Sequence, residues 1–293
     1  MKITDCQIHD VGPMFDWLGE SPEVQQMVMS ELTLAYLDAV GVDRVVLFCG
    51  SDATLAKAMT RSAPDRIAYV PQIEADHPDI DGAIRAAKAR HASGQLGVRM
   101  QISWPMDGSE VRRLEAGGWD LVFAACERHQ VPLFILIVGY LPMVAEIMAR
   151  YPGLPLVIDH IGMRQPPMDE TDDPPFERLQ QLLDLARFPT VSIKLCGIPA
   201  MSKEAYPYRD THAALRRIVD AFGPDRLMWG SDTTRFVGRV SLYRFAHPLT
   251  LQDYPGKHHY AEALFYIRES EVLNDEEKRA ILGGSLERIL GWP

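Results

Sequence analysis

The feature that most restricts the fold of this chain is an alternation that repeats eight times along its length. Short runs of β-branched and aromatic residues, each of strand length, are followed by longer stretches with apolar residues at helical spacing. Eight β-then-α units predict a closed parallel (β/α)8 barrel of the TIM type, which is an α/β fold. The predicted strands are residues 2–9, 44–49, 67–73, 96–102, 132–138, 155–162, 190–197 and 226–232.

The length of the chain and its last segment agree with a single barrel. The chain has 293 residues, and α/β barrels commonly reach this length as one domain. Near the end, Asn274 with Glu277 three residues later is a capping-box pattern, which is typical of the start of a helix. We therefore expect one domain that spans residues 1–293 and ends with a closing helix.

The charge and hydropathy patterns exclude two classes of partner. The formal net charge is −10 and no block of Lys or Arg occurs, so a surface for nucleic acid or anionic lipid is not expected. The longest apolar run, 131–144, is interrupted by Gly139 and Pro142 and is shorter than the roughly 20 residues of a membrane span. The expected partner is a small molecule, and the sequence leaves open whether the chain forms a homo-oligomer.

The four cysteines are interpreted as packing residues. They lie far apart in the sequence, form no C-x-x-C pair, and have no evident activating partner. We see no secretory leader before them, so we expect a reduced, cytoplasmic protein. These residues are Cys6, Cys49, Cys126 and Cys196.

Polar side chains stand near the carboxyl ends of five predicted strands. In a (β/α)8 barrel these ends meet at one mouth, where the active sites of this fold lie. A carboxylate away from water is costly unless it is paired, so Asp232, at the end of an apolar run, is expected to face other polar groups. Asp159 should alternate to the opposite side from its neighbour and have a supporting role. The residues expected to meet at the mouth are Gln7, His9, Arg99, His160, Lys194 and Asp232.

Five segments, in this order, resemble the amidohydrolase superfamily: "TDCQIH", "LVIDHIGM", "VSIKLCGIP", "AYPYRD" and "DRLMWGSD". The resemblance extends from the first strand to "ILGGSLERIL" and is to the branch of lactonases that includes fuconolactonase and pyrone-dicarboxylate lactonase. It implies a barrel with His9, His160 and Asp232 as site residues. It also implies that Arg99 binds a carboxylate or carbonyl group of the substrate.

One position departs from the pattern of this family. Its first strand normally ends in a His-x-His pair, and here the first residue of the pair is Gln7. A carboxamide oxygen is a poor zinc ligand, so a single zinc or manganese ion would have only His9, His160 and Asp232 as strong ligands. The predicted strand 132–138 also lacks the lysine or carboxylate that bridges two metals elsewhere in the superfamily. Because this branch includes members that work without a metal, we favour a metal-independent mechanism.

The chemistry of lactone opening assigns roles to these residues. Water must be deprotonated near the ester carbon, and the oxyanion that develops on the carbonyl oxygen must be stabilised. Asp232 is the candidate base. His9, His160 and the amide of Gln7 are the candidate donors to the oxyanion.

Two cationic residues are candidates for binding an anionic substrate. Arg99 is expected to hold an anionic group bidentately. For Lys194 three readings stay open: it adds a second positive charge, it ends its strand in solvent, or it pairs with Asp232. The irregular segments 164–175 and 233–260 are predicted to rim the mouth, and the second should supply substrate contacts from among Arg235, Arg239, Tyr243, Arg244, His247, His258 and His259.

Three functions are compatible with these features. The first is a hydrolase that opens a lactone or similar cyclic ester of an anionic sugar acid or aromatic-catabolism intermediate. The second is a lactone isomerase or decarboxylase that uses the same barrel without net consumption of water. The third is a degenerate barrel that binds a small acid without chemistry, and the presence of His9, His160 and Asp232 argues against it.

Overall fold

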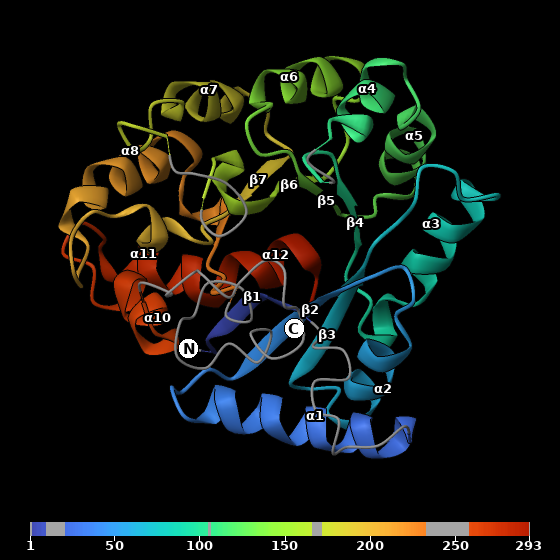
Figure 1. Cartoon of the computed structure of the whole chain (residues 1–293), viewed down its shortest axis with the longest axis horizontal. Helices are drawn as coiled ribbons and strands as arrows, with labels where there is room; N and C mark the ends of the chain where they lie inside the picture. The colour runs from blue at the N-terminus through green and yellow to red at the C-terminus, as the bar shows by residue number, and fades with distance from the viewer. Residues whose placement is uncertain (1, 10–20, 105–106, 166–171, 233–257, 293) are drawn as a thin grey trace.

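All eight predicted strands are present, and they run parallel at the centre of the molecule (Figure 1). The computed structural model describes residues 2–9, 21–104, 107–165, 172–232 and 258–292. The strands are β1 (Thr4–His9), β2 (Arg44–Cys49), β3 (Ile67–Pro71), β4 (Val98–Gln101), β5 (Leu133–Leu136), β6 (Leu156–Ile158), β7 (Val191–Lys194) and β8 (Leu227–Met228).

The strands form two sheets that hydrogen bonds join into a ring. One sheet has the order β1-β2-β3 and the other β4-β5-β6-β7-β8. Between β3 and β4 the N–H of Leu96 donates to the carbonyl oxygen of Tyr69 (3.0 Å). Between β8 and β1 the N–H of Cys6 donates to the carbonyl oxygen of Trp229 (3.0 Å). The prediction of an α/β barrel of the TIM type is confirmed.

The helices α1 to α8 lie around the outside of the strands (Figure 1). The predicted capping box is present at the start of α11, where Asn274 and Glu277 bond to each other's backbone N–H groups. Within the described residues, no helix is both long enough and apolar enough to cross a membrane. The α-helices are α1 (Pro22–Asp38), α2 (Thr54–Ser62), α3 (Ile80–Ala89), α4 (Ser109–Glu115), α5 (Asp120–His129), α6 (Leu141–Arg150), α7 (Leu179–Leu183), α8 (His212–Phe222), α10 (Tyr260–Arg268), α11 (Asp275–Arg279) and α12 (Ser285–Leu290).

Apolar side chains fill both the space between strands and helices and the interior of the barrel. The interior cluster includes Phe48, Phe134 and Val157 from β2, β5 and β6. All four cysteines are buried and unbridged, as expected for packing residues. Apolar side chains therefore fill the barrel interior, and the polar side chains lie at the end of the barrel where the strands have their carboxyl ends.

Six of the eight strands end earlier than predicted, and in β6 and β8 this changes how the polar residues point. β6 stops at Ile158 and continues as a 3₁₀ turn over Asp159–Gly162, whereas the prediction extended it to residue 162. β8 stops at Met228, so Asp232 lies beyond the last paired residue. The predicted irregular segments 164–175 and 233–260 coincide in large part with residues 166–171 and 233–257, which lie outside the described residues.

Candidate active site

Gln7 and His9 face the barrel interior together, as predicted. The register of β1 against β2 shifts between Asp5 and Ile8, a bulge that re-aims the side chains of this stretch. The carboxylate of Asp5 accepts the backbone N–H of Gln7 (3.0 Å) and so satisfies a donor that the bulge removes from the ladder. The end of β1 is thereby fixed with both polar side chains over the core.

Asp5 also ties the end of β1 to the end of β8. It accepts the backbone N–H of Ser231 (2.9 Å) and the hydroxyl of Ser231 (2.5 Å). Burial raises the pKa of Asp5 to about 6, although its hydrogen bonds with Ser231 oppose the shift. The next residue, Asp232, has a φ of 50°, which is uncommon outside glycine, and its N–H donates to the carbonyl oxygen of Gln7 (2.9 Å). The sequence reasoning missed this supporting role of Asp5.

Four predicted side chains meet at one point. His9 Nε2 lies 3.1 Å from Asp232 Oδ1, and His160 Nε2 lies 3.8 Å from Asp232 Oδ2. Gln7 Nε2 lies between them, 3.3 Å from His9 Nε2, 3.2 Å from His160 Nε2 and 3.1 Å from Asp232 Oδ1. Because a carbonyl oxygen can only accept, His9 Nδ1 donates to the carbonyl of Phe48 (3.1 Å) and carries a proton.

Asp159 and His160 both face the interior, so the expectation that they point to opposite sides is wrong. Asp159 stays in phase with Val157, which belongs to the interior cluster. His160 has a φ of 53°, and this left-handed turn redirects its ring to the same side. Burial lowers the pKa of His160 to about 4, against the opposing charges of Asp232 and Asp159, so its ring is neutral at neutral pH.

Asp159 holds two cations behind the mouth. Its Oδ2 accepts from Arg99 Nε (2.8 Å), and its Oδ1 lies 2.8 Å from Lys194 Nζ. The second contact is outside hydrogen-bond geometry and is a pairing of charges. Lys194 is fully buried, with its ammonium 3.6 Å from the centre of the Phe48 ring. Lys194 is therefore neither in solvent nor paired with Asp232, and Arg99 lies nearer to the mouth.

Asp159, Arg99 and Lys194 form a charged triplet with one net positive charge. Burial alone would raise the pKa of Asp159, but the charges of Lys194 and Arg99 outweigh it and hold the pKa at about 2. Asp159 is therefore ionised, and two cations face one carboxylate. Among the described residues, Arg99 donates a hydrogen bond only through its Nε, which leaves its two terminal nitrogens for a ligand.

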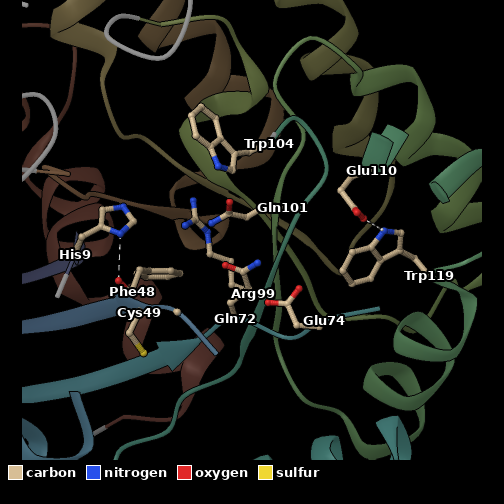
Figure 2. Close-up of a pocket in the computed structure, with 11 residues that line it drawn as sticks. His9, Phe48, Cys49, Gln72, Glu74, Arg99, Gln101, Trp104, Glu110 and Trp119 are labelled. Atoms are coloured by element: carbon tan, nitrogen blue, oxygen red, sulfur yellow. Dashed lines mark hydrogen bonds between the residues drawn. The ribbon is translucent and has the colours of Figure 1, made fainter. Parts of the chain in front are cut away.

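A pocket of about 370 Å³ opens beside these residues, with His9 and Arg99 on its wall (Figure 2). Trp119 Nε1 donates to Glu110 Oε2 (3.1 Å) and fixes one carboxylate of the lining. Burial raises the pKa of Glu74, with the charges of Asp76 and Glu110 adding to the effect. His9 and Arg99 were predicted from the sequence, but the rest of the pocket lining was not; it consists of Phe48, Cys49, Gly50, Gln72, Glu74, Gln101, Trp104, Glu110 and Trp119.

Residues 4–292 match the family model described as Amidohydrolase. The chain belongs to the Amidohydrolase family. The resemblance read from the five sequence segments is confirmed.

Known proteins similar to this amidohydrolase include two lactone hydrolases. The chain is 38% identical over 79 residues to 4-sulfomuconolactone hydrolase of Hydrogenophaga intermedia, a match that covers 27% of this chain and 24% of that protein. It is 33% identical over 109 residues to L-fucono-1,5-lactonase of Burkholderia ambifaria, covering 36% of this chain and 35% of that protein. A solved amidohydrolase from Burkholderia multivorans with bound zinc has a TM-score of 0.73 at 22% identity, with both chains covered completely. This structural likeness concerns the fold.

The structure thus brings the six predicted site residues of this amidohydrolase together near the carboxyl ends of the strands, in two groups, with Lys194 buried behind the mouth. Gln7, His9, His160 and Asp232 form one group, and Asp159 joins Arg99 and Lys194 in the other. Within the predicted loop, His258 is buried and His259 is the N-cap of α10. Its other candidates lie outside the described residues: Arg235, Arg239, Tyr243, Arg244 and His247.

Proposed function

We propose that this amidohydrolase opens a lactone or similar cyclic ester, with Asp232 as the base that activates water. The observation that carries the proposal is the placement of Asp232, whose left-handed backbone turns its carboxylate toward His9 and His160 at the mouth. A buried carboxylate held in an uncommon conformation next to two imidazoles is typical of a functional site.

The reaction uses groups of this chain alone. Asp232 takes a proton from water as the oxygen adds to the carbonyl carbon of the lactone. The bond from that carbon to the ring oxygen then breaks, and the proton held by Asp232 passes to the departing alkoxide. His9, on the pocket wall and 3.1 Å from Asp232, is the donor best placed for the developing oxyanion, where one well-placed donor is typically worth about 3 kcal/mol.

The pocket favours a lactone that carries both an acid group and hydroxyl groups. The terminal nitrogens of Arg99 can bind a carboxylate side by side, with the net positive charge of the triplet behind them. The side-chain oxygens of Gln72, Glu74 and Gln101 line the same pocket and can accept hydrogen bonds from hydroxyl groups. The two relatives described above are each named for a lactone. We therefore favour the lactone of a sugar acid over an aromatic-catabolism intermediate.

The proposal assigns no step to a metal ion. His9, His160 and Asp232 are the donors that would hold one, and the solved neighbour from Burkholderia multivorans contains zinc. Here, however, the amide nitrogen of Gln7 lies between these three side chains at hydrogen-bond distance. The residues as arranged do not fit a metal.

The test is a screen of lactones with and without a carboxylate, followed by the reaction of any substrate in ¹⁸O-labelled water. We expect a carboxylated sugar lactone to be opened and one labelled oxygen to enter the product. Turnover without label would favour the isomerase or decarboxylase alternative. Binding of lactones without turnover of any of them would favour the degenerate barrel.

A further inference from the structure

The amide nitrogen of Gln7 occupies the point on which three distant residues converge. It lies 3.1 Å from Asp232 Oδ1, 3.2 Å from His160 Nε2 and 3.3 Å from His9 Nε2. These three atoms come from the ends of β1, β6 and β8, and they belong to the side chains that would ligate a metal in this barrel. The centre of the site is therefore filled by a side chain of the protein itself.

The distances distinguish an amide centre from a metal centre. Zinc binds histidine nitrogen and carboxylate oxygen at about 2.0–2.2 Å. The contacts around Gln7 Nε2 are all longer than 3 Å, which is the range of N–H hydrogen bonds. Gln7 is fully buried, so its side chain has no solvent to move into.

The chemistry of the neighbours fixes which end of the amide points inward. An amide oxygen in place of Nε2 would face the Asp232 carboxylate at 3.1 Å, acceptor against acceptor. On the other side, the thiol of Cys196 points toward Gln7 Oε1 at 3.9 Å. The NH₂ group therefore faces the centre, where one of its protons is donated to Asp232 Oδ1 and the other to Nε2 of the neutral His160 ring.

The backbone around Gln7 is built to hold this placement. The N–H of Gln7 binds Asp5, and its carbonyl accepts the N–H of Asp232. Gly230 packs against the same residue, since a Cβ there would lie 2.6 Å from Cys196 Sγ and 3.3 Å from Gln7 Cβ. Asp5 on β1 and residues that follow β7 and β8 thus limit the freedom of Gln7.

We propose that the Gln7 carboxamide takes the place of a metal ion in this barrel. It is a positioning residue that holds His9, His160 and Asp232 in one arrangement, and it closes the site to divalent metals. The positioning part rests on the proposed function, whereas the exclusion of metal is independent of any substrate.

The first experiment measures metal binding and needs no substrate. The parent protein, Gln7→His and the control Gln101→His are titrated with Zn²⁺ and Mn²⁺, and the bound metal is counted after dialysis. Gln101 lines the adjacent pocket, so its variant adds an imidazole away from the centre. We expect about one tightly bound equivalent only in Gln7→His, because an imidazole restores the ligand pair. Stoichiometric metal in the parent, or no gain in Gln7→His over the control, would overturn the proposal.

The second experiment tests the amide itself, with Gln7→Met as a variant of similar shape. In the parent labelled with ¹⁵N-glutamine, the side-chain N–H protons of Gln7 should exchange slowly with solvent, and this protected pair should be missing from Gln7→Met. Absence of such a pair in the parent contradicts an amide centre. With an identified substrate, kcat of Gln7→Met should fall while KM changes little. An unchanged kcat removes the positioning role, and failure to find any substrate leaves the metal titration to decide.

Discussion

Replacing Asp159 with asparagine should destabilise the protein and release Arg99. The carboxylate of Asp159 lies 2.8 Å from both Arg99 Nε and Lys194 Nζ, and all three side chains are buried. Its pKa of about 2 means that it carries its charge at every pH of interest. The substitution therefore changes a triplet of net charge +1 into two buried cations with no counter-charge.

The expected cost follows from this geometry. Removing one partner from a buried ion pair typically costs about 3–5 kcal/mol, because an uncompensated charge remains. The ring of Phe48, 3.6 Å from the Lys194 ammonium, still contacts this cation in the variant, so we expect the cost at the lower end of this range. We expect a net loss near 3 kcal/mol, which lowers Tm by roughly 6–12 °C in a protein of this size.

A double variant separates stability from positioning. In Asp159→Asn with Lys194→Met only one of the two unpaired cations remains, so Tm should recover most of the loss. Arg99 still lacks its anchor there, so KM for a carboxylated lactone should stay high. Thermal unfolding and steady-state kinetics measure the two effects. An unchanged Tm in Asp159→Asn refutes the argument from buried charge, and a double variant with normal KM refutes the positioning of Arg99.

Three further predictions follow from the same site. Asp232→Asn keeps the size and hydrogen bonding of the side chain but removes its basicity. We therefore expect kcat to fall at least about 10²-fold while the fold and ligand binding stay intact. Near-full turnover would rule out the role of Asp232 as base. Arg99→Met should raise KM strongly for a carboxylated lactone and much less for a neutral analogue, whereas an equal effect on both would make Arg99 structural. Asp5 has a pKa of about 6 in the fold, above its ordinary 3.8, so it contributes stability that is lost as pH rises between these values. In Asp5→Asn that loss should disappear. The free energy of unfolding should therefore rise more from pH 4 to pH 6 than in the parent. Identical pH dependences of the free energy of unfolding in the two proteins would contradict the raised pKa of Asp5.

The arrangement of the barrel could be predicted from the sequence because every strand carries its own signal. Each apolar run of strand length precedes a helical pattern. In a (β/α)8 barrel, strands that follow one another in the sequence are neighbours in the sheet, so their order follows from the fold. The residues at the strand ends follow from the same logic, since parallel strands bring their carboxyl ends together. His9 and Gln7 were placed correctly because their spacing of two holds within a strand.

The directions of Asp159 and His160 could not be predicted, because the period of two applies only while a strand continues. β6 ends at Ile158, and the positive φ of His160 reverses the expected direction of its side chain. Neither residue is a glycine, so the sequence carries no local signal for this turn. The partner of Lys194 was equally hidden, since Asp159 follows the end of the neighbouring strand β6, 35 residues earlier in the sequence. A buried aspartate within an apolar strand was the available signal for Asp5, because such a carboxylate needs partners.

The role of position 7 shows the limit of reading a site by comparison of residue types alone. Compared with the His-x-His pattern, the glutamine at position 7 removes one histidine ligand, and by this comparison the metal site is incomplete. In the fold, the carboxamide reaches the point shared by His9, His160 and Asp232 and adds two N–H donors there. Whether a substitution leaves a gap or fills one depends on distances between strands that are more than 150 residues apart in the sequence. The same residue change therefore removes a ligand and supplies a hydrogen-bond centre, and only the geometry makes the second effect visible.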